Sequence, residues 1–261
     1  MMTQSHKASP RPEAKVALVT GGARRVGRAI ALKLAEAGYD LAITYRTSSD
    51  AANEAVEVIQ ALGRQAMAIQ VDLSQPEAAD HVHRLFTQEF DRLDALINNA
   101  SFFEACPLHS VTDTLFDKAM AVNARAPLLL IRKFAPLLAA GGDFDEPHTL
   151  GRIVNFVDIH VMGQPLPGYV AYNASKAALY EITMTLSQEL APLITVNGIA
   201  PGVVAWPDAY SDEERRQYLK RVPLGRAGTL DDAATAVLFL VHDAHYCTGQ
   251  IVKIDGGRPL T

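Results

Sequence analysis

Short apolar runs alternate with amphipathic stretches along most of the chain. The first run, at 16–19, is followed by a glycine turn at 21–22 and then by apolar residues at helical spacing up to Gly38. Further runs typical of strands lie at 40–45, 66–71, 94–98, 152–157, 194–200 and 251–254. Helical patterns separate them, at 50–62, 76–90, 113–139, 173–191, 212–220 and 230–241.

This alternation predicts a doubly wound α/β fold of the Rossmann type with a seven-stranded parallel sheet, because crossover helices cover both faces of such a sheet. We expect 1–14 to be a loose tail and 15–261 to be one domain. The segment 141–150 is predicted to be an exposed loop, and 203–225 a movable lid over the substrate. Ligands of such folds bind beyond the carboxyl ends of the strands.

Composition excludes several classes of function. The 261 residues include 24 Lys and Arg against 29 Asp and Glu, a net charge of −5, which offers no basic surface for nucleic acid. No run of about 18 apolar residues could cross a bilayer, and the N-terminus lacks the apolar stretch of a secretory signal. Cys106, Cys247, His109 and His160 show no ligand or disulfide spacing, so we expect a soluble cytoplasmic protein without metal.

The turn TGGARRVG at 20–27 follows the first strand, where a helix N-terminus offers unpaired N–H groups to a pyrophosphate. The second strand ends in Tyr45-Arg46-Thr47, without an acidic residue for an adenosine ribose. Arg46 and Arg24 can instead bind a 2′-phosphate, which favours NADPH over NADH, unless both are solvated surface charges. Asp72 closes the third strand, as an adenine contact or as a helix N-cap.

Tyr172 and Lys176 are four residues apart, so on a helix they share one face. A nearby ammonium favours the phenolate form of a tyrosine and eases proton transfer near neutral pH. Taken alone, such a pair is more often an ordinary surface contact.

The motifs TGGARRVG at 20–27, NNA at 98–100, YNASK at 172–176 and PG at 201–202 occur in an order and spacing that resembles the short-chain dehydrogenase/reductase family along nearly the whole chain. The resemblance implies hydride transfer from a nicotinamide and a homotetramer. It also implies that Tyr172 is the proton donor, that Lys176 binds the nicotinamide ribose and tunes Tyr172, and that Asn123 supports a proton relay.

Two departures from the family pattern concern the substrate. Arg25 stands where the family usually has Gly or Ala, and Asp158 where it usually has Ser. An ionised carboxylate would repel a ketone oxygen that becomes negative as hydride arrives, so we expect a nitrogen heterocycle with a C=N bond. With ASFFE at 100–104, both departures resemble the pteridine reductase branch, including dihydromonapterin reductases. There Phe103 would stack on the pterin; Glu104 replaces a frequent tyrosine.

The main hypothesis is therefore an NADPH-dependent pteridine reductase acting on a dihydropterin, with oxidised pterin or dihydrofolate as further substrates. The alternative is a carbonyl reductase of the same family, acting on a 3-oxoacyl thioester or a quinone, and a third reading is a non-catalytic NADPH sensor. Phe103 as a core aromatic and Asp158 as a structural cap remain open.

The candidate residues fall into three groups. The catalytic candidates are Asp158, Tyr172, Lys176 and Asn123. The cofactor-binding candidates are Gly21, Arg24, Arg25, Val26, Tyr45, Arg46, Thr47, Asp72, Leu73, Asn99, Ala100, Ser101, Tyr172, Lys176, Pro201 and Gly202. The substrate-binding candidates are Arg25, Ser101, Phe103, Asp158, Tyr172 and Trp206, and Leu224 is a further lid candidate.

Overall fold

A computed structural model of the chain describes residues 14–140, 143, 145–146, 150–206 and 210–258. The predicted N-terminal tail, except Ala14, and most of the predicted loop at 141–150 lie outside the described residues. All seven predicted strands are present, each within one residue of its expected bounds. They are β1 (Val16–Val19), β2 (Asp40–Tyr45), β3 (Ala66–Gln70), β4 (Ala95–Asn98), β5 (Gly151–Phe156), β6 (Ile194–Pro201) and β7 (Ile251–Ile254).

The strands form one parallel sheet in the order β3-β2-β1-β4-β5-β6-β7. Central β1 pairs with β2 on one side and β4 on the other, with Val19 opposite Ile43 and Ile97. The chain therefore reverses its direction of winding beside β1, which makes the carboxyl ends of β1 and β4 the expected binding crevice. The doubly wound fold is confirmed.

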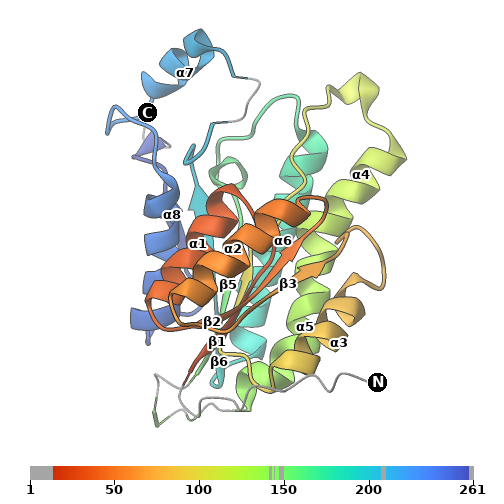
Figure 1. The fold of residues 1–261 in the computed structure, drawn as a ribbon. Coiled ribbons are helices and arrows are strands. Elements are labelled where there is room, and N and C mark those ends of the chain that lie inside the picture. Colours follow the sequence, from red (N-terminus) through yellow and green to blue (C-terminus); the bar gives the residue numbers. More distant parts are fainter. Residues whose placement is uncertain (1–13, 141–142, 144, 147–149, 207–209, 259–261) are drawn as a thin grey trace.

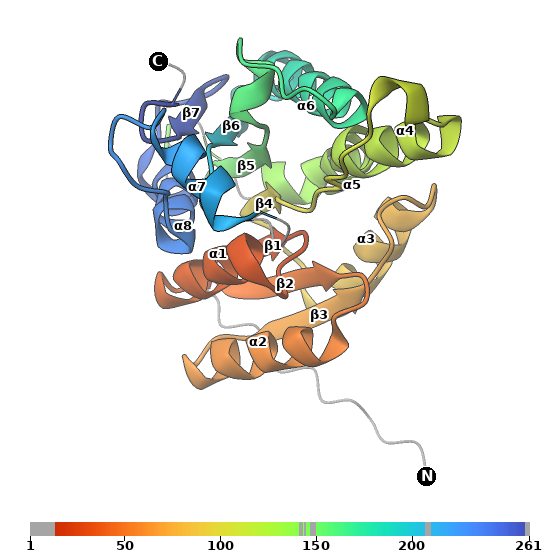
Figure 2. The ribbon, with the colours of Figure 1, turned by 90° about the horizontal axis from the view of Figure 1, so that it is seen from above.

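Helices cover both faces of the sheet (Figures 1 and 2). They are α1 (Arg25–Glu36), α2 (Ser49–Ala61), α3 (Ala78–Glu89), α4 (Asp113–Met120), α5 (Ala126–Ala139), α6 (Val170–Glu189), α7 (Asp212–Leu219) and α8 (Leu230–Leu238). One face is packed by α1, α2 and α8, and the other by α3, α5 and α6, with α4 lying against α6. No described helix is both long and apolar enough to cross a membrane.

Each face has its own apolar core. Ile30 and Leu34 of α1 pack with Ile59 of α2 against one side of the central strands. On the other side, Phe86 of α3 meets Phe134 of α5 edge to face, with ring centroids 5.1 Å apart. Because strands buried on both faces are held rigidly, the loops at their carboxyl ends have fixed starting points.

The structure divides the helix predicted over 113–139. It forms α4, a π-helical turn at Ala121–Arg125, and α5. Pro127 has no N–H group, so the carbonyl of Asn123 cannot receive its regular α-helical hydrogen bond, and the ladder widens at this point. Asn123 therefore lies on a wide turn in the middle of a long helical run.

Candidate active site

The glycine turn between β1 and α1 has little space for side chains. Gly21 has a φ of +66°, and a Cβ on Gly27 would lie 2.1 Å from the Gly21 carbonyl oxygen. Asn99 Nδ2 donates to the Thr20 carbonyl oxygen at 2.8 Å, which fastens the turn to the end of β4. Arg24 occupies the N-cap of α1 without a side-chain cap, so it leaves first-turn N–H groups available to an anion.

A cavity of about 520 Å³, here the glycine-turn cavity, opens beyond the carboxyl ends of β1 to β4. Arg46 and Thr47 are exposed at its wall directly after β2. Ten of the predicted cofactor-binding residues line it: Gly21, Arg24, Tyr45, Arg46, Thr47, Asp72, Leu73, Asn99, Ala100 and Ser101. Uncapped helix amides for a pyrophosphate and a guanidinium for a further phosphate are a donor set that fits an NAD(P) cofactor.

Asp72 belongs to this cavity but does not cap a helix. Its Oδ1 accepts hydrogen bonds from the N–H and hydroxyl of Ser74 at 2.9 and 2.7 Å. These bonds, the backbone one first, lower the pKa of the Asp72 carboxyl. Since α3 begins at Ala78 with Glu77 as its N-cap, the helix-cap interpretation of Asp72 is wrong.

A second cavity of about 840 Å³, here the tyrosine cavity, lies beside the first. Ser101 and Phe103 line both cavities, so the loop after β4 forms their boundary. The tyrosine cavity also contains Arg25, Val26, Asp158, Tyr172, Pro201 and Gly202 among the predicted residues.

Asp158 and Tyr172 face each other in this cavity. The Tyr172 hydroxyl donates to Asp158 Oδ2 at 2.5 Å, and both side chains are buried. Asp158 Oδ1 accepts the His160 N–H at 2.8 Å, so Asp158 also caps the short 3₁₀ helix Ile159–Val161. The predicted structural cap and the predicted partner of the tyrosine are therefore the same residue, with one oxygen for each task.

The structure corrects the expected state of the phenol. Burial, followed by the charge on Asp158 and the hydrogen bond to it, raises the pKa of Tyr172 well above 10. We had expected Lys176 to lower this pKa. The opposite occurs because the phenol is buried and the charge that acts on it is a carboxylate, and both keep Tyr172 protonated as a proton donor at neutral pH.

Lys176 lies one helical turn after Tyr172 on α6, as the spacing predicts. Its side chain is 2% exposed, its Nζ donates to the Phe156 carbonyl oxygen at 2.6 Å, and the Nζ lies 5.8 Å from the centroid of the Tyr172 ring. Burial lowers the pKa of Lys176 to about 8, against an opposing effect of Asp158.

Asn123 is fully buried and positions the loop after β4. Its amide Nδ2 donates to the Phe102 carbonyl oxygen and to Ser175 Oγ, both at 2.9 Å, and its Oδ1 accepts the Phe102 N–H at 2.7 Å. Asn123 thus fixes the backbone next to Phe103. Its predicted support of a proton relay stays a prediction.

Phe103 is not a core aromatic, because 43% of it is exposed. One face of its ring stacks on Tyr169 with centroids 4.6 Å apart, and Tyr172 meets it edge-on at 4.8 Å. Phe102 is partly buried, with the Lys118 ammonium 4.7 Å from its ring centroid. Phe103 is the residue of the pair that offers ring surface to a ligand.

Arg25 has a role that the sequence did not reveal. It is the one non-glycine residue with positive φ in the described part of the chain, at +50°. Its Nη2 donates to the carbonyl oxygens of Ala205 and Trp206 at 3.1 and 2.8 Å. Arg25 therefore ties the segment after β6 to the glycine turn.

Trp206 and Leu224 do not occupy the places expected of them. Trp206 is absent from the described walls of both cavities and packs on Tyr210 and Tyr218 instead. Leu224 lines a separate hollow beside Gly256. The tyrosine cavity uses Tyr218 and Arg258 there, and sequence reasoning assigned neither to the site. Tyr218 belongs to no recognisable motif, whereas Arg258 stands in the closing segment IVKIDGGRPL, which is similar to the family but indicates no role for this side chain.

No group of three or more His, Cys, Asp or Glu side chains within the described ranges could hold a metal ion. His160 lines the tyrosine cavity, but its Nδ1 lies 2.7 Å from the Gln164 carbonyl oxygen. It acts in the structure as part of the loop after β5.

Comparisons with known proteins agree with this geometry. A family model described as enoyl-(acyl carrier protein) reductase matches residues 21–258. A 3-oxoacyl-[acyl-carrier-protein] reductase of Staphylococcus epidermidis is 36% identical over 248 residues, covering 93% of this chain and 98% of the relative. An uncharacterized oxidoreductase of Bacillus subtilis is 37% identical over 250 residues, covering 93% and 96%.

Solved structures are equally similar. A putative short-chain alcohol dehydrogenase from Sinorhizobium meliloti superposes with a TM-score of 0.86 at 32% identity, covering 95% of this chain and 97% of that one. A blue fluorescent protein from a metagenomic library, in complex with NADPH, gives 0.84 at 34% identity, covering 94% and 97%.

The fold and the two cavities thus define an NAD(P)-dependent oxidoreductase. The chain belongs to the short-chain dehydrogenase/reductase family. The pteridine reductase branch finds no support among these relatives, which favour the carbonyl-reductase alternative. The homotetramer stays a prediction.

Proposed function

We propose that the protein is an NADPH-dependent reductase of a nitrogen heterocycle with a C=N bond, a dihydropterin first of all. The observation that carries this proposal is the buried Asp158 carboxylate, which accepts the Tyr172 hydroxyl at 2.5 Å. A carbonyl reductase needs donors around an oxygen that gains negative charge, and a carboxylate in that place opposes the charge. A ring nitrogen that receives a proton becomes an N–H donor, which a carboxylate stabilises.

The residues then have separate tasks. A bound nicotinamide cofactor supplies the hydride that adds to the ring carbon. Tyr172 is protonated because its pKa is raised. Its O–H turns from Asp158 to the ring nitrogen and gives up its proton, and the phenolate then takes a proton from solvent while Asp158 accepts the hydroxyl again. The exposed surface of Phe103 stacks on the flat heterocycle. Arg46 contacts the 2′-phosphate that distinguishes NADPH from NADH.

Relatives favour a second candidate, reduction of a 3-oxoacyl thioester. The 3-oxoacyl-[acyl-carrier-protein] reductases of two Staphylococcus species are 35–36% identical to this chain. In that case an ordered water would provide the hydrogen bond that the missing serine hydroxyl gives elsewhere in the family.

Asp158→Ser separates the two candidates. NADPH oxidation is measured for the wild type and the variant with a dihydropterin, dihydrofolate, a quinone and an acetoacetyl thioester. We expect the wild type to prefer the dihydropterin, and the variant to lose that activity while gaining thioester reduction. A wild type that reduces the thioester or the quinone faster than the dihydropterin overturns the proposal in favour of the second candidate.

Two controls accompany this experiment. NADPH fluorescence titration of Asp158→Ser should match the wild type, which shows that the cofactor site is intact. Tyr172→Phe should bind NADPH equally well and lose turnover on whichever acceptor is reduced. Tight NADPH binding by the wild type without turnover on any acceptor would instead indicate the sensor.

A further inference from the structure

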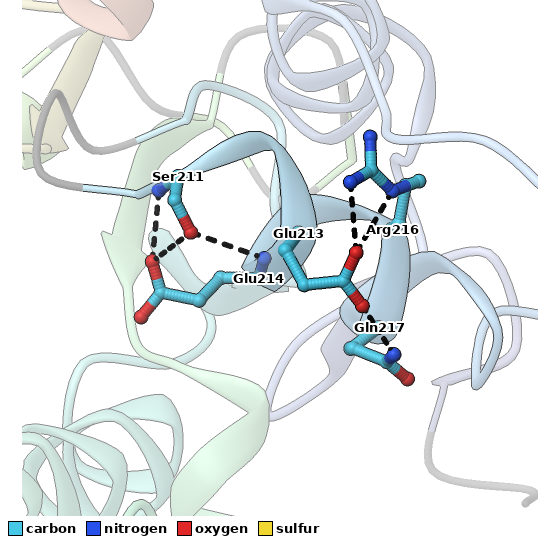
Figure 3. A network of polar contacts seen from close by, with 5 residues as sticks. All are labelled: Ser211, Glu213, Glu214, Arg216 and Gln217. Atoms are coloured by element: carbon cyan, nitrogen blue, oxygen red, sulfur yellow. Dashed lines mark hydrogen bonds and ion pairs between the residues drawn. The ribbon is translucent and has the colours of Figure 1, made fainter.

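The helix α7 lies apart from both helical layers, beyond one end of the sheet (Figure 1), and none of its residues is buried. Its own polar contacts maintain the helix (Figure 3): Ser211 and Glu214 form a capping box, and Glu213 accepts from Arg216 and Gln217. Glu213 and Glu214 line the tyrosine cavity, yet their recorded hydrogen bonds stay within this helical segment. The contact between α7 and the substrate region must come from another residue.

That residue is Tyr218, near the end of α7. Its hydroxyl oxygen accepts the Val203 N–H at 3.3 Å. The Arg258 guanidinium lies 5.0 Å from the centre of its ring, and the Trp206 ring meets it edge-on at 5.5 Å. A Cβ on Gly202 would lie 3.4 Å from the hydroxyl. Tyr218 is therefore held in one position in the wall of the tyrosine cavity.

The Tyr218 hydroxyl, which accepts a bond through its oxygen, also has a proton of its own to donate. No acceptor for its O–H is found among the described residues, although Asp158 and Tyr172 line the same cavity. Burial raises the pKa of Tyr218 and outweighs the Val203 N–H and the charge on Arg258, which lower it, while the charge on Asp158 adds a smaller increase. The hydroxyl thus stays protonated at neutral pH as a fixed hydrogen-bond donor.

We propose that the Tyr218 hydroxyl donates a hydrogen bond to an acceptor atom of the bound substrate, so that α7 takes part in recognition. This deepens the proposed function and rests on it. The cavity then offers a hydrogen-bond acceptor, Asp158, from the loop after β5 and a donor, Tyr218, from α7. Such a pair suits a ring that carries an N–H group for Asp158 and an acceptor, either a carbonyl oxygen or a ring nitrogen, for Tyr218. A cyclic amide fused to a heterocycle has both.

Tyr218→Phe tests this inference, because it removes the hydroxyl and keeps the ring between Arg258 and Trp206. We expect kcat/KM for the acceptor to fall about 3- to 10-fold, the usual effect of losing one neutral hydrogen bond, mainly through a higher KM. The KM for NADPH should match the wild type, and the melting temperature should fall only modestly, because the Val203 N–H loses its acceptor. Tyr246→Phe, at a fully exposed tyrosine, is the matched control and should change nothing.

A second variant separates recognition from anchoring. Tyr218→Leu removes the hydroxyl and the ring contacts together. A change of kcat/KM within about twofold is smaller than the loss of one hydrogen bond causes. If Tyr218→Phe stays within that range while Tyr218→Leu loses activity, the residue only anchors α7 and the inference is wrong.

All assays use the acceptor that the wild type reduces fastest. A preference of the wild type for a thioester would refute the proposed function, and the Phe variant would still decide the role of Tyr218. If the wild type reduces the dihydropterin and Tyr218→Phe leaves kcat/KM unchanged, the proposed function stands and only the Tyr218 inference is refuted.

Discussion

Lys176→Met should change how the stability of the protein depends on pH. Burial lowers the pKa of Lys176 from 10.5 to about 8. Between these values the unfolded chain binds a proton at this lysine and the folded chain does not. Stability therefore rises with pH across this window, since it rises wherever the unfolded state binds more protons. Below pH 8 the folded protein bears the full cost of a buried ammonium.

The size of the effect follows from the shift. A change from 10.5 to about 8 corresponds to about 3 kcal/mol in total, at about 1.4 kcal/mol per pKa unit. Between pH 7.5 and 9.5 the wild type should gain about 2 kcal/mol in free energy of unfolding relative to Lys176→Met, which has no titrating group there. The raised pKa of Tyr172 acts in the opposite direction only above pH 10, where unfolded tyrosine begins to ionise.

Urea unfolding at pH 7.5, 8.5 and 9.5 measures the difference. Lys253→Met, at an exposed lysine of β7, serves as the control and should follow the wild type at all three values. If the wild-type and Lys176→Met curves stay parallel across the range, Lys176 is not destabilised by burial and the reasoning fails. Lys176→Met should also lose turnover, because the family resemblance assigns this lysine to the cofactor ribose.

Two further predictions concern the cofactor. Arg46→Ala should raise the KM for NADPH at least about 10-fold, because a charge-assisted hydrogen bond is lost. The KM for NADH should stay unchanged. Equal effects on both cofactors in initial-rate assays would contradict the assignment. Gly27→Ala should abolish NADPH binding and lower the melting temperature, because its Cβ would lie 2.1 Å from the Gly21 carbonyl oxygen. Unaltered fluorescence titration with NADPH would disprove that packing argument.

The fold could be predicted because its strands are short apolar runs bounded by glycines and charged residues. Helical hydrogen bonding changes within two of the predicted helices, 113–139 and 230–241, because each contains a π-helical turn. In 113–139 a continuous apolar pattern conceals this change. Pro127 carries the information for that change, since it cannot donate to Asn123. Proline is also common in the first turn of an ordinary α-helix. The sequence alone therefore does not distinguish a new helix that begins at Pro127 from a continuing helix that widens there.

The arrangement of site residues could be predicted where it follows from their spacing along one helix. The protonation of the site could not, because it depends on residues from other elements. Tyr172 and Lys176 share a helical face at any position in a protein, so their arrangement follows from four residues of separation. The direction in which the pKa of Tyr172 shifts depends first on burial and then on the charge of Asp158, which belongs to a different element, and spacing along α6 indicates neither. Trp206 lies in an irregular segment, where no periodicity indicates which way a side chain points.

The similarity to 3-oxoacyl reductases does not decide the substrate, because identity averaged over 248 residues gives every position the same weight. Chemistry does not. A unit charge about 4 Å from a reacting oxygen costs on the order of 4 kcal/mol in a partly shielded site, and each 1.4 kcal/mol is about tenfold in rate. Asp158 is in hydrogen-bond contact with the proton donor Tyr172. A ketone oxygen that Tyr172 protonates would lie at about that 4 Å distance from the carboxylate, and its reduction would be slowed roughly a thousandfold unless water intervenes. We therefore propose that Asp158, one side chain at the end of β5, sets the substrate despite the general similarity to 3-oxoacyl reductases.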